Sequence, residues 1–211
     1  MIHSTRVSVR EITGALGRIV CVALFTSMLA ACTRGVQWEE EVVLNTGETI
    51  VVERQGTYTF ILFSGASGFI GYAPDWRSTI EFTYKGRRYR HTDELSPVLL
   101  AIAPDGTPNL VASLGSEWGW KHKYYCVTPY YVQLRPDQSG KEWSWPDKIE
   151  PWLYDLPTNL LIGIAPMEAD GKKLGPVDRK TMNASLTAVY KYFQVIDQTH
   201  TVDFCPRRTS P

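Results

Sequence analysis

Hydrophobic and polar residues alternate over short stretches along much of this chain. In residues 78–84 (STIEFTY) every second position from Ile80 onward is a large apolar residue, so these side chains share one face of an extended strand. Lys85-Gly86 then supplies a turn, and residues 87–91 return as a second strand. This pattern predicts a β-hairpin.

Two further hairpins are predicted by β-branched or apolar runs that flank short loops containing glycine. Asp105-Gly106 supplies the positive φ that a tight turn requires. The predicted hairpins pair residues 40–44 with 49–53 around the loop 45–48, and residues 97–103 with 108–114 around the loop 104–107.

Two more stretches are rich in β-branched and aromatic residues. Residues 57–63 and 124–134 are therefore expected to be strands, the second broken or bulged at Pro129. Residues 64–76, which are rich in glycine and small residues, are expected to form a loop.

The C-terminal part of the chain has a less regular pattern. Prolines punctuate residues 135–166, so regular elements there should be short, and residues 172–178 read as a polar connector. Residues 181–196 fit helical spacing, with Thr181 as a cap, but their second half also suits a strand, which we favour.

Many short strands separated by turns predict a mainly β fold. We expect an antiparallel β-sandwich or an open barrel built from hairpins. The alternative is an α+β fold with one helix in the C-terminal half, over residues 151–165 or 181–195.

The N-terminus has a different composition. Residues 1–18 carry three arginines against one acid, and the uncharged apolar run 19–31 follows. The run is shorter than the roughly 20 residues of a spanning helix and suits the core of a signal peptide.

This run ends in Leu29, Ala30, Ala31 and Cys32, an order that resembles the lipobox of bacterial lipoproteins. In that family signal peptidase II cleaves before the cysteine, and the cysteine carries the acyl chains, palmitate among them. The resemblance implies that residues 1–31 are removed and that Cys32 anchors the chain in a membrane. Thr33, where an aspartate marks inner-membrane retention, favours the outer membrane facing the periplasm. The alternatives are ordinary secretory cleavage near residues 28–31 and an uncleaved anchor, which the charges that follow disfavour.

The expected organisation is a removed signal (1–31), a lipidated tether (32–37) and a single mainly β domain (38–211). After residue 31 acidic residues slightly outnumber basic ones, without a basic stripe. This balance excludes nucleic acid as an expected partner and gives no direct electrostatic grip on anionic lipid.

Two cysteines remain once Cys21 leaves with the signal and Cys32 is lipidated. In an oxidising compartment Cys126 and Cys205 most simply form a disulfide. A nucleophilic cysteine near His122 is a weaker alternative, because the periplasm disfavours a free thiol. A metal site formed by Cys126, Cys205 and a histidine is also weaker, because the ligand spacing is missing.

Five tryptophans in the central part of the chain are candidates for ligand binding. Exposed indole rings can stack on sugar rings, whereas buried ones act as core pillars, which is the more common role in small β domains. The five are Trp118, Trp120, Trp143, Trp145 and Trp152.

No catalytic motif is found, and neither a cofactor nor a metal is expected. A pair of carboxylates could hydrolyse a glycosidic bond, but most acids on such a chain are solvated. The candidates are Asp93, Glu94, Glu142, Asp147, Glu150 and Asp155. The histidines lack metal-binding spacing, and the serines lie outside a GxSxG motif.

Three stretches, residues 40–54, 99–112 and 145–161, resemble small proteobacterial lipoproteins of unknown function. We therefore expect a membrane-anchored, non-enzymatic binding or structural module with an envelope protein or a glycan as its partner. The alternative is a periplasmic hydrolase that acts on cell-wall glycan through residues 143–152. A third alternative, which no particular residue supports, is a surface protein of a mobile element that blocks entry or contact.

Overall fold

The computed structural model describes residues 33–61, 71–113, 123–124, 127, 129–146, 148–163, 167–185 and 194–199. The chain divides into two units, Met1–Arg34 with Thr59–Ala73, and Gly35–Tyr58 with Pro74–Pro211. In the described part of the first unit, the rings of Phe60 and Tyr72 meet edge to face, with centroids 5.3 Å apart. The first three strands of the chain extend from the second unit into the first, whereas the later strands, the helix and the candidate site belong to the second unit.

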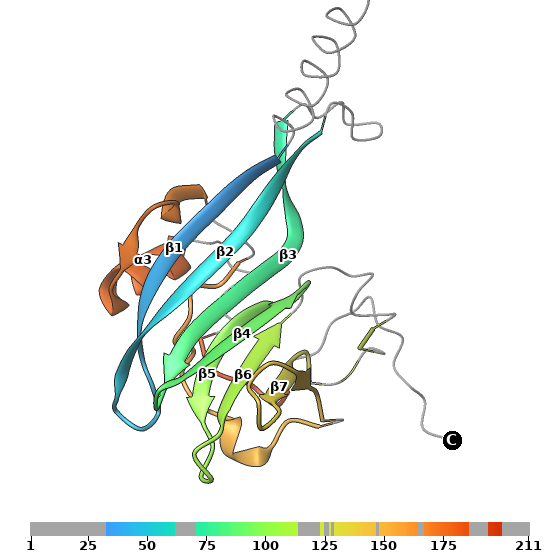
Figure 1. The fold of residues 1–211 in the computed structure, drawn as a ribbon, viewed down its shortest axis with the longest axis vertical. Helices are drawn as coiled ribbons and strands as arrows, with labels where there is room; N and C mark the ends of the chain where they lie inside the picture. Colours follow the sequence, from blue (N-terminus) through green and yellow to red (C-terminus); the bar gives the residue numbers. More distant parts are fainter. Residues whose placement is uncertain are drawn as a thin grey trace, which may run out of the picture. The chain divides into compact units, whose positions relative to one another are not determined.

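A five-stranded sheet is built from the N-terminal half of the chain and one short strand from the C-terminal half. Its order is β4-β3-β2-β1-β9, and β1 to β4 lie side by side in chain order (Figure 1). β9 pairs in parallel with β1, Glu39 opposite Lys173. The strands are β1 (Thr33–Val43), β2 (Thr49–Ile61), β3 (Gly71–Tyr84), β4 (Arg87–Asp93) and β9 (Lys173–Leu174).

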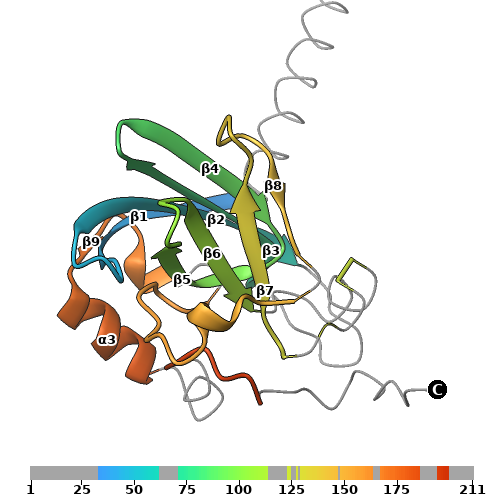
Figure 2. The ribbon, with the colours of Figure 1, turned by 90° about the horizontal axis from the view of Figure 1, so that it is seen from below.

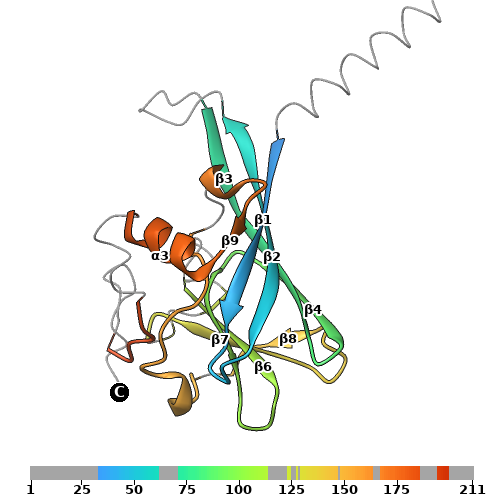
Figure 3. The ribbon, with the colours of Figure 1, turned by 90° about the vertical axis from the view of Figure 1, so that its left-hand side faces the viewer.

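A four-stranded sheet forms the second layer (Figure 2). Its order is β5-β6-β7-β8, with antiparallel pairing throughout. The strands are β5 (Ser96–Ile102), β6 (Pro108–Ser113), β7 (Val132–Pro136) and β8 (Trp143–Ser144). The helix α3 (Pro176–Ser185) lies beyond β9, at the β1 edge of the first sheet (Figure 3). The mainly β prediction is confirmed, as a sandwich with a helix rather than a closed barrel.

The two sheets pack face to face through one apolar cluster. Every second residue of β1 to β4 points inward, which is the alternation that the sequence shows. The cluster joins Val42, Val52, Ile80, Phe82 and Tyr89 of the first sheet to Leu100, Ile102, Leu110, Val132 and Leu134 of the second.

β5 and β6 are buried on both faces. Their outer face packs against the irregular stretch that follows β8, through Ile149, Leu153 and Ile162, with Ile196 completing the contact. This double burial explains why residues 97–103 are almost continuously apolar, whereas the strands of the first sheet alternate.

The three predicted hairpins are confirmed as β1–β2, β3–β4 and β5–β6. Gly106 has a φ of +83° in the β5–β6 turn, as its Asp-Gly pair indicates. Regular elements between 135 and 163 are short, also as expected: β8 has two residues and the 3-10 helix η2 (Pro151–Leu153) has three.

Two expectations in the N-terminal half are wrong. Residues 33–37, expected to be a tether, belong to β1, because Val36 is buried and continues the inward alternation. Residues 71–76 lie in β3 rather than in a loop. The strand expected over residues 57–61 is confirmed, as the last part of β2. Among the described residues of the stretch 124–134, strand begins at Val132, beyond the break expected at Pro129, which has no N–H for a ladder.

Two further expectations, in the C-terminal half, are also wrong. Residues 172–178, expected to be a connector, contain β9 and the start of α3. The helix begins at Pro176, five residues before the predicted cap Thr181, because proline suits the first helical position. The choice between helix and strand for 186–193 lies outside the described residues, and Val195 forms an isolated bridge with Pro157.

Candidate functional site

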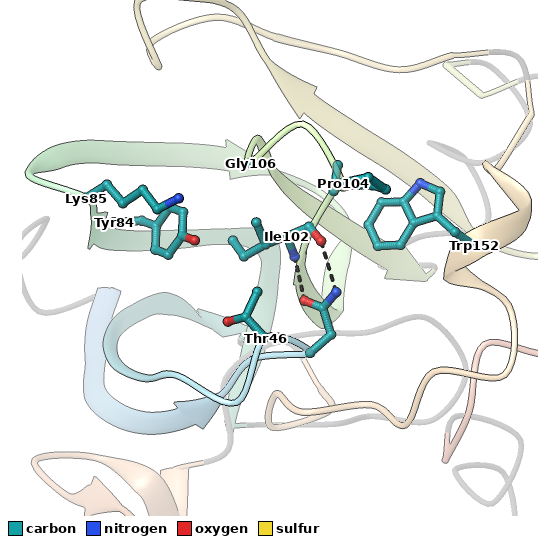
Figure 4. Close-up of a pocket in the computed structure, with 9 residues that line it drawn as sticks. Thr46, Tyr84, Lys85, Ile102, Pro104, Gly106 and Trp152 are labelled. Atoms are coloured by element: carbon teal, nitrogen blue, oxygen red, sulfur yellow. Dashed lines mark hydrogen bonds between the residues drawn. The ribbon is translucent and has the colours of Figure 1, made fainter.

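A groove of about 370 Å³ lies where the turns of the three hairpins meet. The β1–β2, β3–β4 and β5–β6 turns lie together at the lower end of Figure 1, and η2 supplies the remaining wall. This volume falls within the roughly 300–1,000 Å³ of small-molecule sites. The nine lining residues are Asn45, Thr46, Tyr84, Lys85, Ile102, Ala103, Pro104, Gly106 and Trp152 (Figure 4).

Asn45 fixes the first turn against the second sheet. Its side-chain amide donates to the carbonyl of Ile102 at 2.9 Å and accepts from the Ile102 N–H at 2.7 Å (Figure 4). These two bonds imitate the pairing of neighbouring strands, so the floor of the groove joins both layers of the sandwich.

Trp152 is positioned by a chain of charged hydrogen bonds. Its indole N–H donates to Glu150 at 2.5 Å, and the other oxygen of Glu150 accepts from Arg135 at 3.2 Å. Arg135 also pairs with Asp105 in the β5–β6 turn. The half-buried indole is thereby held beside Pro104, with part of its ring facing the groove (Figure 4).

Lys85 and Tyr84 form the opposite side of the groove (Figure 4). The ammonium of Lys85 lies 5.3 Å from the centre of the Tyr84 ring. It also reaches the β5–β6 turn, because a Cβ atom at Gly106 would lie 3.7 Å from Nζ. Lys85 has neither an ion pair nor a hydrogen bond within the described residues, and it is the only charged residue of the nine.

The predicted tryptophans do not converge on one site. Trp152 lines the groove, whereas Trp143 and Trp145 are partly buried against the core between the sheets. The Trp143 indole N–H donates to the carbonyl of Arg90 at 2.8 Å, which anchors β8 to β4. Trp143 and Trp145 therefore pack as structural residues of the core, the alternative to stacking on sugars. Trp118 and Trp120 lie outside the described residues.

Asp93, one of the predicted acids, is a buried hub beside these tryptophans. It accepts hydrogen bonds from Lys123 Nζ and Tyr124 Oη, both at 2.7 Å. His91 Nε2 lies 3.6 Å from Asp93 Oδ2, too far for a hydrogen bond.

The electrostatics of this hub favour a charged aspartate and a neutral tyrosine. Burial by itself raises the pKa of Asp93, but the His91 imidazole, the hydrogen bonds from Lys123 and Tyr124 and the charge of Lys123 outweigh it and hold the pKa well below its usual range. Burial and Asp93 raise the pKa of Tyr124 far above its usual value. The hub therefore joins β4 to residues 123–124, and an aspartate that stays ionised cannot act as a general acid.

The other predicted acids form no catalytic pair within the described residues. Asp105, which was not predicted, and Glu150 lie next to lining residues in the sequence or by hydrogen bond, and both bind Arg135. Glu48 accepts from the hydroxyl of the lining residue Thr46 at 3.2 Å. The N–H and side chain of Thr107, with Arg135, hold the pKa of Asp105 below its usual range. Glu142 and Asp155 line no part of the groove, and Asp147 lies outside the described residues.

A buried ion pair was missed by sequence reasoning. Glu40 and Arg54 point inward from β1 and β2, and their side chains have no exposed surface. Glu40 accepts from Arg54 at 3.2 Å, from the Trp38 indole at 2.9 Å and from the Leu161 N–H at 2.7 Å. Burial lowers the pKa of Arg54, and the charge of Glu40 opposes this shift. The signal was a charged residue at an inward position of each strand.

The remaining predicted residues are not described. Leu29, Ala30, Ala31 and Cys32, and the expected disulfide partners Cys126 and Cys205, lie outside the described residues. In the part of the chain that the structure describes, no three His, Cys, Asp or Glu side chains are grouped as a metal site would require. Over the same part, no helix combines the length and apolar character needed to cross a membrane.

Comparisons of the chain with protein-family models, with curated proteins and with solved structures found no match.

Proposed function

We propose that this protein is a lipid-anchored lipoprotein of the bacterial outer membrane whose β domain binds cell-wall glycan through the groove between the hairpin turns. The observation that carries the binding role is the groove itself, with a half-buried indole fixed at its wall by Glu150. A fixed aromatic ring offers a flat apolar face to a sugar at little entropic cost.

The anchor is compatible with this use of the groove. β1 begins at Thr33, directly after Cys32, and ends at Val43, next to the groove residue Asn45. Gly35 and Val43 are separated along β1 by about 26 Å at the usual strand rise of about 3.3 Å per residue. This length of strand lies between the N-terminal end of the second unit and the groove.

The contacts of the nearest acids favour binding over hydrolysis. A glycosidase needs one carboxyl group that carries a proton and a second that is free to attack or to activate water. Here Asp105 and Glu150 share Arg135, and the lowered pKa of Asp105 keeps it ionised at neutral pH.

Co-sedimentation with purified peptidoglycan sacculi tests the proposal. The full-length lipoprotein in detergent should pellet with the sacculi without releasing soluble fragments, and a Trp152→Leu variant should pellet less. Release of soluble glycan fragments would instead support the hydrolase. Protein that stays in the supernatant would contradict binding to the cell wall.

A further inference from the structure

We propose that the groove selects carboxylated saccharides, with the acid group at Lys85 and a sugar face on Trp152. This inference rests on the proposed binding function and names the class of ligand. It does not depend on the lipid anchor.

The charge of the lining points to an anionic ligand. Lys85 is the only charged side chain among the nine lining residues, and within the described part of the chain it has no anionic partner. Three nearby acids have other partners: Asp105 and Glu150 both bind Arg135, and Glu48 accepts from Thr46. A carboxylate on the ligand would give the Lys85 ammonium a charge-assisted hydrogen bond.

The backbone of the hairpin turn sets the direction of the Lys85 side chain. The residue has a φ of +48° at the tip of the β3–β4 hairpin, in the left-handed region that non-glycine residues seldom adopt. The following Gly86 has a φ of +77° and completes the two-residue turn. This turn directs the ammonium toward Tyr84 and Gly106, across the groove rather than away from the protein.

The aromatic side chains define the rest of the ligand. Figure 4 places Lys85 with Tyr84 on one side and Trp152 with Pro104 on the other, with Ile102 between them. A lone carboxylate would meet only the lysine. A chain of sugar rings with acid groups can meet the cation and the indole together.

Isothermal titration of the full-length protein in detergent with trigalacturonate tests this assignment. The matched ligand is its methyl ester, which keeps the rings and removes the charge, and acetate serves as the lone carboxylate. We expect trigalacturonate to bind, the ester to bind about tenfold more weakly, and acetate to bind too weakly to measure. Binding should weaken at about 1 M NaCl, where the Debye length is about 3 Å.

Variants assign the effect to the groove. Lys85→Asn should weaken trigalacturonate binding about tenfold, because asparagine accepts positive φ but cannot reach the groove. Lys141→Asn is the matched control, an exposed lysine in another turn, and should bind like the wild type. Trp152→Leu should weaken the acid and the ester alike, with thermal unfolding used to check that the variant is folded.

Equal affinity for acid and ester, or unchanged affinity in Lys85→Asn, would overturn the assignment. So would the absence of trigalacturonate binding. If the protein pellets with sacculi in these cases, the proposed function stands and only the ligand class falls. If trigalacturonate binds but the protein does not pellet with sacculi, the ligand class stands and binding to the cell wall falls.

Discussion

Replacing the buried Glu40 should strongly lower the free energy of unfolding. Glu40 is buried between two apolar clusters and accepts three hydrogen bonds, from Trp38, Arg54 and Leu161. Glu40→Ala should lower the free energy of unfolding by about 3–5 kcal/mol, because it leaves the Arg54 charge buried and unpaired. Urea denaturation followed by circular dichroism measures the change.

The neighbouring Glu39 is the matched control, because its side chain faces solvent on the other side of β1. Glu39→Ala should change the stability by about 0.5 kcal/mol or less. The double variant Glu40→Leu/Arg54→Met should be more stable than Glu40→Ala, since it removes both buried charges. Equal losses for Glu39 and Glu40 would refute the assigned role.

Asp93 should make the stability of the folded protein depend on pH in the acid range. Its pKa is lowered in the folded state, so its contribution to stability is fully present above the pKa of the unfolded chain, about 3.9. As the pH falls below that value, the unfolded state takes up a proton first and the contribution is lost. Stability should therefore fall more steeply with acid in the wild type than in Asp93→Asn.

Wild type and Asp93→Asn are compared by urea denaturation between about pH 7 and pH 3, and their stabilities should change differently below about pH 4, where this carboxyl takes up a proton in the unfolded state first. At neutral pH Asp93→Asn should cost about 1.5–3 kcal/mol, as expected for hydrogen bonds to a charged group. Parallel curves for the two proteins would show that Asp93 is not held in its charged form.

At the scale of elements, Asn159 joins the two sheets. Its amide donates to the carbonyls of Val43 at 2.9 Å and Leu100 at 2.8 Å and accepts from the Leu100 N–H at 2.8 Å. Asn159→Ala should destabilise the protein by about 1–3 kcal/mol, because it leaves buried backbone groups unpaired. Hydrogen exchange should show the Leu100 N–H losing protection.

Gln55→Ala provides the comparison, since Gln55 is exposed on the outer face of β2. It should leave both stability and exchange at Leu100 unchanged. Unaltered protection in Asn159→Ala would mean that the sheets are held together without this side chain.

The elements that were predicted correctly are those set by local chemistry. Alternation and the turn residues Lys85-Gly86 and Asp105-Gly106 specify their hairpins within a few residues. β9 was missed because two residues become a strand only by pairing with β1, more than a hundred residues earlier. Local patterns do not carry such long-range pairings.

The candidate site was predictable only in part. Trp152 was proposed for stacking from its residue type, and it lines the groove. Lys85 was read only as a turn residue, because its neighbours across the groove come from two other hairpins and from η2. The arrangement of hairpin turns, which decides the site, arises from the packing of the two sheets.

At the scale of the whole molecule, the proposal depends on the N-terminus. The four residues before Thr33 set the expected cleavage and lipidation, and β1 follows them without a spacer. Such an anchor would hold the start of the strand close to the membrane surface. The expected disulfide between Cys126 and Cys205 would be formed in the same oxidising compartment.

The most direct test is the intact mass of the protein from the membrane fraction, for wild type and Cys32→Ala, with and without reduction. We expect a wild-type chain that starts at Cys32 and carries acyl chains, and that gains the mass of two hydrogens on reduction. Cys32→Ala should lack the acyl chains and the cleavage before residue 32. A soluble wild-type product cut at another residue, with free thiols, would contradict the lipoprotein account.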